Sequence, residues 1–483
     1  MGILAGAAGL RLWHLSAGVP HALEIDEPAI VDRALHILET GNWNPRGFLY
    51  PSLVIYLHVG VAAARFLWGT THAEWRALRD FDIAAAYNAA RFITALIGTA
   101  TVWLTYRLGR DLHSQALGLV AAAQLASFPM HVRESHFALT DVPTTALVVL
   151  TLWLTVVAGR KRTVSAYAWA GFAAGLSAAA KYNGAVVAVA IGLAWLTYET
   201  AAPDRGRKAL AAIATMTVAF LLAVPYTLLD LPGFLNGFGG QLAHFSPHSQ
   251  YASVDSPWRT YLTFLSQAGT FWLPLSVVGL ALILWRQRPL KPWVVPIGFI
   301  AVYYYVLASR GVALGRYALP LLPGICLLAA VPVVEVSRIV QEHISRRHVA
   351  STLAALATTG IVAVFASDSV AWLDGFNRPD TRVIASRWMI AALPKGTRIV
   401  AENAGPTNLR YDGYDLLDEP NLIDDSALDA AMKKGLEYIV VARWSAKALP
   451  TDSRYVNAGD TVLRVDPSEQ RWGPLVRIIR VAR

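Results

Sequence analysis

Charged residues are scarce in this chain of 483 residues. They make up 16% of it and hydrophobic residues make up 55%, whereas about 25% of the residues of a soluble protein are charged. Apolar runs of about 17–25 residues predict transmembrane helices. Such runs without any Asp, Glu, Lys or Arg occupy residues 142–158, 209–229, 260–285, 292–309, 317–334 and 349–367. We therefore exclude a single soluble core and predict a multi-pass membrane protein.

Several motifs of common enzymes are also missing. The chain has one cysteine, Cys326, so no disulfide can form within it. It contains no GxxxxGKS or GxxxxGKT loop, no CxxC pair and no GxSxG segment. These absences argue against sugar nucleotides as direct donors, thiolate metal sites and serine hydrolases. The first apolar segment is followed by no small-residue cleavage site, so we expect an uncleaved helix.

The net charge of +9 comes largely from basic residues in short loops. Such loops mark the cytoplasmic side of a membrane protein, so the positive charge does not imply nucleic-acid binding. They contain Arg107 and Arg110; Arg160, Lys161 and Arg162; Arg205, Arg207 and Lys208; Arg286, Arg288 and Lys291; and Arg346 and Arg347. This pattern predicts eleven spans at about residues 2–18, 85–106, 113–130, 142–158, 164–180, 184–199, 209–228, 259–285, 292–309, 316–335 and 349–367.

Residues 50–68 are apolar enough to span as well, and a span there would invert every later loop. We expect them to lie at the outer interface, where Tyr50, Tyr56 and Trp68 suit the headgroup region. With this topology the remaining polar clusters all fall on the outer face, at residues 24–27, 131–141, 181–183, 230–258 and 310–316.

Three carboxylates, those of Glu24, Asp26 and Glu27, follow the first apolar segment. Residues 28–40 then predict an amphipathic helix that begins with a proline and stops before a glycine. The acidic pair could simply cap this helix. A carboxylate can also take a proton from a hydroxyl group, and cations at the same face could hold a phosphate. Chemistry on an anionic lipid is therefore the functional hypothesis.

Other ionisable residues have both a functional and a structural interpretation. Arg91 lies in an apolar helix, where an arginine is costly and is a functional candidate, although it could reach the interface by snorkelling. Lys181 has the same alternative at a helix end, and Asp141 could cap the helix that follows it. Histidines could form a metal site with carboxylates, with His244 and His248 as candidates, but metal-free loop histidines are commoner.

Five stretches of the chain carry a further signal through their order. They are IDEPAIVDRALHILETGNWNPRGFLYPSLVIYL, AARFITALIGTATVWLTYRLGRDL, SHFALTDVPTTALVV, GLSAAAKYNGAVV and GRYALPLLPG. Together, in this order, they resemble GT-C glycosyltransferases. The resemblance covers about residues 10–335 and is closest to the branch of protein O-mannosyltransferases and lipid A aminoarabinose transferases. Tyr-Pro-Ser at residues 50–52 departs from the usual element with two prolines, and the eukaryotic O-mannosyltransferase signatures are absent. The resemblance therefore does not specify a protein acceptor.

The resemblance implies a mainly α, polytopic, GT-C-like fold with about 11 transmembrane helices plus juxtamembrane helices. It also implies a polyprenyl-phosphate-sugar donor, inversion at the sugar, and an extracytoplasmic acceptor that is a cell-envelope glycan, a lipid or a protein. The catalytic candidates are Asp26 as base, Glu27 and Asp141. The donor-phosphate candidates are Arg91, Lys181, Arg310 and Arg316, and the substrate-pocket candidates are Tyr50, His136, Tyr182 and His248. No cofactor is required, with a divalent metal as an unsupported alternative.

Residues 370–483 are less apolar than the transmembrane domain at 1–369 and predict a small extracytoplasmic α/β domain. We expect helices at 378–392 and before Gly435, and strands at 398–402, 437–442 and 475–481. No catalytic constellation stands out in this domain, so its expected role is to cover the active site or to bind the acceptor.

Two other function classes stay open. A transporter or flippase for a lipid-linked sugar is one, although such proteins usually contain inverted repeats and a site at the membrane midplane, and the chain shows neither. A non-catalytic membrane scaffold is the other, and it would tolerate loss of the acidic pair.

Overall fold

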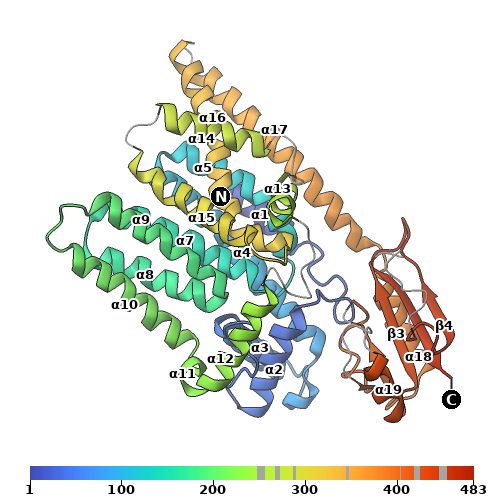
Figure 1. Ribbon diagram of the computed structural model, residues 1–483. Coiled ribbons are helices and arrows are strands. Elements are labelled where there is room, and N and C mark those ends of the chain that lie inside the picture. The colour runs from blue at the N-terminus through green and yellow to red at the C-terminus, as the bar shows by residue number, and fades with distance from the viewer. Residues whose placement is uncertain are drawn as a thin grey trace. The chain divides into compact units, whose positions relative to one another are not determined.

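A computed structural model describes residues 1–246, 256–266, 272–286, 290–343, 347–402, 404–417, 425–444 and 454–482 (Figure 1). The chain divides into two compact units. The first consists of Met1–Trp13, Ile30–Ala64 and Ala90–Val370, and the second of His14–Ala29, Arg65–Ala89 and Ala371–Arg483. The segment that carries the acidic pair therefore belongs to the same unit as the C-terminal residues.

The first unit is helical. Its helices, some of which extend beyond it, are α1 (Gly2–Leu12), α2 (Glu27–Thr40), α3 (Leu53–Thr71), α4 (Ile83–Leu112), α5 (Gln115–Ser127), α6 (Pro129–Glu134), α7 (Asp141–Lys161), α8 (Val164–Ala180), α9 (Ala188–Tyr198), α10 (Arg205–Ala223), α11 (Tyr226–Leu229), α12 (Leu231–His244), α13 (Pro257–Ser266), α14 (Trp272–Arg286), α15 (Val294–Ala308), α16 (Leu322–His343) and α17 (Arg347–Asp374). Helix α8 packs against both α7 and α10.

Many helices of the described part of the chain could cross a membrane. Seven are long and apolar enough, namely Leu53–Thr71, Ile83–Leu112, Asp141–Lys161, Arg205–Ala223, Lys291–Ala308, Gly315–Glu342 and Ser351–Asn377. Shorter apolar helices are Gly2–Leu12, Gln115–Ser127, Val164–Ala180, Tyr182–Tyr198 and Trp272–Trp285. Each of the eleven predicted spans overlaps one of these segments, and the mainly α, multi-pass membrane fold is confirmed.

Helix α3 is the additional apolar helix. Val54 and Ile55, in its first turn, pack with Ile30, Ala34 and Ile37 of α2 in one buried hydrophobic cluster. The amphipathic helix predicted at 28–40 is present, but we expected its apolar face to lie on the membrane, and here these residues are buried against α3. We predicted that α3 lies at the membrane interface, but its 19 residues also have the length and composition of a span, so these properties do not support the interfacial position.

The first predicted helix is shorter than expected. We predicted a helix over about 2–18, whereas α1 ends at Leu12 and Trp13 is extended. His14 and Gly18 then have φ angles of 56° and 73°. A right-handed helix cannot include such left-handed residues, which explains the early end.

Other predicted helices comprise more than one element. The described residues of 259–285 belong to α13 and α14, and 267–271 lie outside the described residues. Residues Gly315–Leu321 form the 3-10 helix η4 before α16 begins at Leu322. Proline lacks the N–H that an α-helix needs in its interior, and Pro320 and Pro323 stand on either side of this junction.

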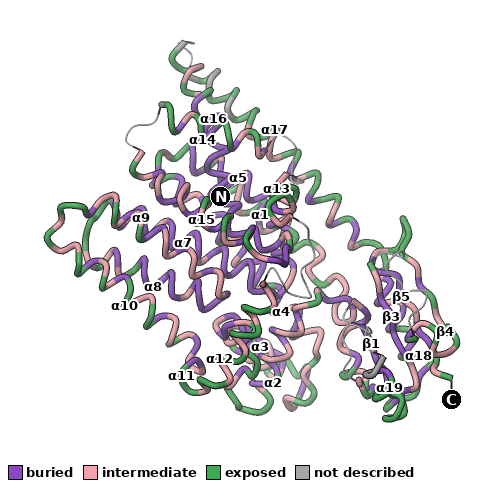
Figure 2. The backbone as a smooth tube through the Cα atoms, in the orientation of Figure 1, coloured by how far each residue is buried: buried purple, intermediate pink, exposed green. Residues whose placement is uncertain are grey.

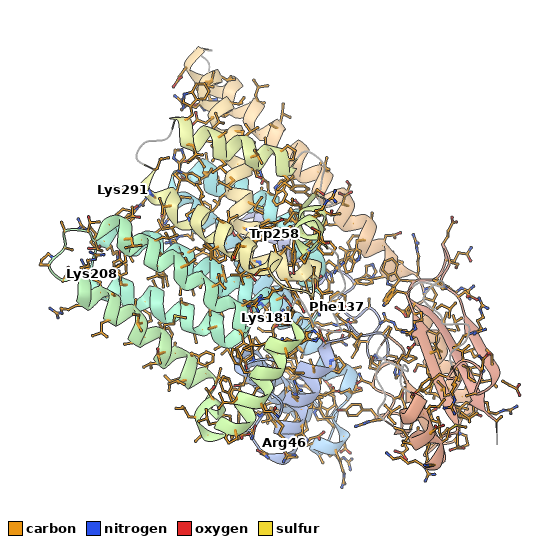
Figure 3. The ribbon with its side chains drawn as sticks, in the orientation of Figure 1. Arg46, Phe137, Lys181, Lys208, Trp258 and Lys291 are labelled. Atoms are coloured by element: carbon orange, nitrogen blue, oxygen red, sulfur yellow. The ribbon has the colours of Figure 1, made fainter. Side chains whose placement is uncertain are left out.

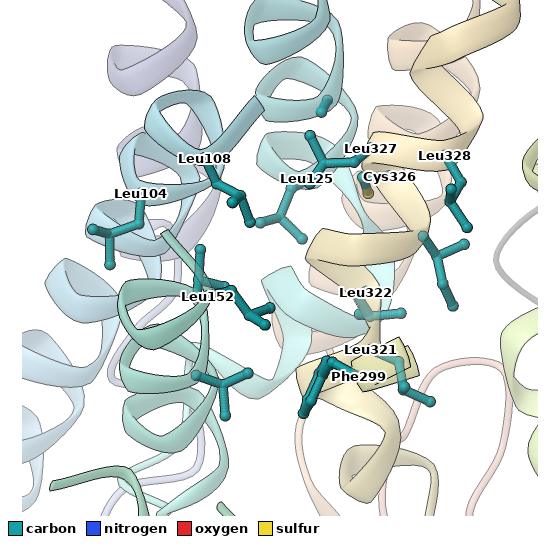
Figure 4. Close-up of a cluster of buried hydrophobic side chains, with 14 of the residues drawn as sticks. Leu104, Leu108, Leu125, Leu152, Phe299, Leu321, Leu322, Cys326, Leu327 and Leu328 are labelled. Atoms are coloured by element: carbon teal, nitrogen blue, oxygen red, sulfur yellow. The ribbon is translucent and has the colours of Figure 1, made fainter. Parts of the chain in front are cut away.

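Leucine-rich faces of several helices meet in the core of the first unit. Figure 4 shows buried leucines of α4, α5, α7 and α16 together with Phe299 of α15 and Cys326. The buried positions in Figure 2 follow these contacting faces. Arg11, an unusual charge in an apolar segment, is fully buried and donates to the carbonyl oxygens of Leu125 and Ala126 at 3.2 and 2.8 Å. It therefore stabilises the C-terminal end of α5, where a cation is favourable.

The second unit contains the predicted α/β domain. Five strands, β1 (Arg398–Ala401), β2 (Asp415–Leu416), β3 (Tyr438–Arg443), β4 (Gly459–Val465) and β5 (Leu475–Val481), form a sheet in the order β2-β1-β3-β5-β4. Strand β1 is parallel to β2 and β3, whereas β5 is antiparallel to β3 and β4. Helices α18 (Thr381–Ala392) and α19 (Asp425–Lys433) complete it. The predicted elements are present, and β2 and β4 were not predicted.

Candidate active site

Asp141, Lys181 and Arg316 come together in the first unit. Lys181 Nζ lies 2.6 Å from Asp141 Oδ1, and Arg316 Nε lies 3.9 Å from Asp141 Oδ2. The three residues are only 5%, 7% and 8% exposed. One carboxylate therefore faces two cations, and the charge of these three side chains sums to about +1. A buried excess of positive charge favours an anionic ligand with oxygen acceptors.

Helix ends place these side chains. Asp141 is the first residue of α7, where the helix dipole stabilises a carboxylate. Lys181 directly follows α8 in an extended conformation, and η4 carries Arg316. Ion pairs at helix ends in a membrane protein face the bundle interior or an aqueous cavity, and this pair is buried inside the bundle.

A second buried ion pair lies at the other end of the same helices. Glu199 Oε2 is 2.8 Å from Lys208 Nζ, and Glu199 Oε1 is 3.4 Å from Arg162 Nε. Arg162 directly follows the 21 residues of α7, which are roughly 30 Å long at 1.5 Å per residue. Lys181 and Lys208 are labelled in Figure 3 at these opposite ends. The basic residues Arg162 and Lys208 and the cluster around Asp141 thus lie at opposite ends of the helices.

A cavity of about 240 Å³ adjoins the cluster. Four predicted site residues line it, namely Tyr50, Lys181, Tyr182 and Arg310. Much of the remaining wall is apolar, with Phe238 and Leu242 of α12 and Val306 and Leu307 of α15. The cavity thus combines two cations with a hydrocarbon surface, which suits an amphiphile with an anionic headgroup.

Aromatic residues that the sequence analysis did not select complete this site. Lys181 Nζ lies 4.3 Å from the centre of the Tyr317 ring, and such a contact stabilises an ammonium group. Asn183 Nδ2 donates to the Tyr303 hydroxyl at 2.9 Å, and this hydroxyl donates to the Tyr317 carbonyl oxygen at 3.2 Å. Tyr317 could have been found from its place beside Arg316 in the stretch GRYALPLLPG.

Arg91 and His136 are buried in the first unit but do not line the cavity. Arg91 is 1% exposed, and its guanidinium lies 5.4 Å from the centre of the Phe137 ring. This burial inside the protein argues against a snorkelling anchor. Both ring nitrogens of His136 face backbone oxygens, those of Val132 and Trp13, at 2.8 and 3.0 Å. Burial lowers the pKa of His136 to about 4 and outweighs the two backbone oxygens, which favour the protonated ring.

The histidines proposed for a metal do not assemble into a site among the described residues. No group of three or more His, Cys, Asp or Glu that could hold a metal ion occurs there. His244 ends α12 with its ring 5.1 Å from that of Phe245, and His248 lies outside the described residues. Independence from a metal stays a prediction.

Asp26 and Glu27 belong to the second unit, whereas the residues grouped above belong to the first. Glu27 begins α2 and is fully buried, and its Oε2 accepts a hydrogen bond from the backbone N–H of Glu24 at 2.9 Å. Glu27 therefore closes the turn that precedes α2, whereas a helix cap accepts a hydrogen bond from an N–H inside the helix. This contact thus does not support the capping role that we considered for the acidic pair. Asp26 is partly exposed.

The comparison with protein-family models gives one match. Residues 83–228 match the model described as dolichyl-phosphate-mannose-protein mannosyltransferase. This region includes Arg91, Asp141 and Lys181. A search of curated protein sequences gave no match.

Solved structures are similar to nearly the whole chain. ArnT from Cupriavidus metallidurans bound to undecaprenyl phosphate is 15% identical, with a TM-score of 0.65 over 99% of this chain and 97% of that chain. The archaeal oligosaccharyltransferase AglB from Archaeoglobus fulgidus, in complex with an inhibitory peptide and a dolichol-phosphate, is 12% identical, with a TM-score of 0.65 over 91% of this chain and 69% of that chain. The chain therefore has the fold of these GT-C proteins, and the predicted resemblance is confirmed.

Proposed function

We propose that this protein is an inverting membrane glycosyltransferase that moves a sugar from a polyprenyl-phosphate donor to an extracytoplasmic acceptor. The observation that carries this proposal is the cavity at the end of α8, where Lys181 and Arg310 meet an apolar wall. A polyprenyl phosphate has the matching chemistry, because its phosphate pairs with cations and its isoprenoid chain with the apolar surface.

In the proposed reaction, the acceptor hydroxyl gives its proton to the Asp26 carboxylate while its oxygen attacks C1 of the donor sugar. The bond from C1 to the phosphate oxygen breaks on the opposite face, and the phosphate keeps the electron pair. Lys181, with Arg310 and Arg316, stabilises the charge that develops on the phosphate. Asp141 keeps both Lys181 and Arg316 in place through its two oxygens. Tyr50 and Tyr182 line the same cavity and are proposed to contact the substrate.

The comparisons support a lipid-phosphate donor over the alternative functions. The similar ArnT and AglB structures were solved with undecaprenyl phosphate and with dolichol-phosphate, and the matching family model is described by a dolichyl-phosphate sugar donor. No comparison favours a flippase or a scaffold. Among acceptors, we propose a hydroxyl of an envelope glycan, a lipid or a protein.

A transfer assay with the full chain tests this function. We expect the purified protein in lipid nanodiscs to release polyprenyl phosphate from at least one polyprenyl-phosphate sugar when an envelope extract supplies acceptors. Mass spectrometry of both products measures the transfer. Movement of intact donor across a vesicle membrane without release of polyprenyl phosphate would show a flippase and contradict the proposal.

We also propose that the cluster around Asp141 faces the extracytoplasmic side. The basic residues beside the Glu199 ion pair, at the other end of α7, support this orientation through the positive-inside rule. Alkaline phosphatase and fluorescent-protein fusions provide the measurement. A fusion after Lys161 is expected to report the cytoplasm, and a fusion at the C-terminus the outside. An outside location after Lys161 together with a cytoplasmic C-terminus would show that the proposed orientation is wrong.

A further inference from the structure

The segment His14–Ala29, which carries the acidic pair, is bound to the sheet-containing part of its unit by its own backbone. The Pro20 carbonyl oxygen accepts hydrogen bonds from Thr407 Oγ1 at 3.0 Å and from Asn408 Nδ2 at 2.9 Å. The His21 carbonyl oxygen accepts one from the Thr407 N–H at 2.9 Å. The carbonyl groups of Pro20 and His21 thus accept hydrogen bonds from Thr407 and Asn408, which lie 386 to 388 positions later in the chain.

A third carbonyl group is held by Arg382, in the first turn of α18. Arg382 Nη1 donates to the Leu23 oxygen at 2.9 Å. The guanidinium is itself fixed, because Nε and Nη2 donate to the two carboxylate oxygens of Asp380 at 3.0 and 2.8 Å. This planar fork is a bidentate pairing that lysine cannot reproduce. Arg382 is only 9% exposed, so the contact is well shielded from water.

The anchored part of the segment is rigid for local reasons as well. Ala22 and Leu23 are 6% and 1% exposed, and the Ala22 N–H donates to the Gly18 oxygen at 2.6 Å. Gly18 has a φ of 73°, and a Cβ there would lie 2.6 Å from the Ala22 oxygen, so only glycine fits. The hydrogen bond from Glu24 to Glu27 then continues this ordered chain up to α2.

We infer that Arg382, Thr407 and Asn408 are positioning residues for catalysis, which hold the loop that presents Asp26. This inference rests on the proposed function, in which Asp26 is the base. Residues 13–26 contain no α-helix or strand. The backbone before Asp26 is therefore fixed by individual hydrogen bonds, which include these contacts and that of the His21 ring with the Thr407 oxygen at 3.1 Å. A general base needs placement within about 0.5 Å, and a shift of about 1 Å can cost about a hundredfold in rate.

Two sets of variants test the inference in the full chain. Thr407→Val with Asn408→Asp removes both side-chain donors, and aspartate tolerates the left-handed φ of 60° at residue 408. Arg382→Met removes the third contact, and Arg382→Lys should restore little. Arg464→Met is the control, because Arg464 pairs with Asp466 in the same unit at 2.9 Å and makes no described contact with the segment.

We expect both sets to lower kcat by about tenfold or more with little change in donor KM, because donor contacts are not altered. Hydrogen exchange followed by mass spectrometry should show faster exchange at residues 20–27 while β3 and β5 stay protected. The control should change neither. Unchanged kcat together with unchanged exchange at 20–27 would overturn the inference.

The exchange measurement separates this inference from the proposed function. If the wild-type protein transfers no sugar, the proposed function fails, whereas faster exchange at residues 20–27 in the variants would still show that the contacts hold the loop. If the wild type is active and the variants exchange faster at full kcat, the anchoring is structural only and the positioning role is wrong.

Discussion

Replacing Asp26 by Asn is expected to reduce sugar transfer by about 10²–10⁴-fold, the usual contribution of a general base. Asparagine has nearly the same shape but cannot accept the proton of the attacking hydroxyl. Because Asp26 is partly exposed, the change should leave the melting temperature almost unchanged. The measurement is the rate of polyprenyl phosphate release, with donor binding and thermal melting determined on the same preparation.

Two further carboxylates of the same region serve as comparisons for this variant. Glu39→Gln changes an exposed carboxylate at the far end of α2 and should keep full activity. Glu27→Gln changes the buried residue that accepts the Glu24 N–H. It should lower stability as well as activity, because the buried carboxylate holds the turn before α2 and a neutral amide accepts that hydrogen bond less strongly. Transfer by Asp26→Asn within about threefold of wild type would remove Asp26 from the role of base.

The helices were predictable because each contains its own signal. Long apolar runs bounded by charged or proline-containing loops gave every predicted span, and α8 agrees with its expected bounds of 164–180. The errors occur where local backbone geometry overrides hydropathy. Nothing in the hydropathy of residues 13–18 indicates the left-handed residues that end α1.

The sheet was less predictable than the helices. Strand β2 has two residues, and β4, at the edge of the sheet, has exposed or partly buried residues at every position before Val465. Neither has the continuous apolar run of β3, whose four central residues are buried. Short and edge strands are stabilised by neighbours that are distant in sequence, so their own residues give only a weak signal.

For the site, the sequence indicated which residues matter but not how they pair. Asp141 and Lys181 were both expected at one membrane face, yet the contact between them depends on how α7 packs against α8. Tyr317 lies beside the predicted Arg316 in the sequence. Its contact with the Lys181 ammonium, however, joins residues that are far apart in the chain and depends on the fold.

The second large effect is expected for Lys181→Met. Methionine keeps the length and apolar character of the side chain and removes its charge and its three N–H donors. A charge-assisted hydrogen bond contributes about 1.5–3 kcal/mol, so the Kd for polyprenyl phosphate should rise about tenfold to a hundredfold. Binding of this ligand to the protein in nanodiscs, measured by native mass spectrometry, gives the result directly.

Lys208→Met is a matched control for this loss of binding. Each lysine pairs with a buried carboxylate, at 2.6 Å for Lys181 and 2.8 Å for Lys208. In both variants one cation remains beside the carboxylate, Arg316 at 3.9 Å or Arg162 at 3.4 Å. Each variant breaks one ion pair with a buried carboxylate, and Lys208→Met also breaks the pair with the more exposed Asp204 at 2.7 Å. Lys208→Met should therefore lose at least as much thermal stability as Lys181→Met.

Only Lys181→Met should lose donor binding, since Lys208 lies at the other end of the helices, away from the cavity. Equal affinity of Lys181→Met and wild type for polyprenyl phosphate would show that this lysine serves only its ion pair with Asp141. Arg310 would then be the cation of the cavity wall left to hold the phosphate. Equal weakening by both lysine variants would instead mean that binding follows stability, and it would contradict a specific phosphate contact at Lys181.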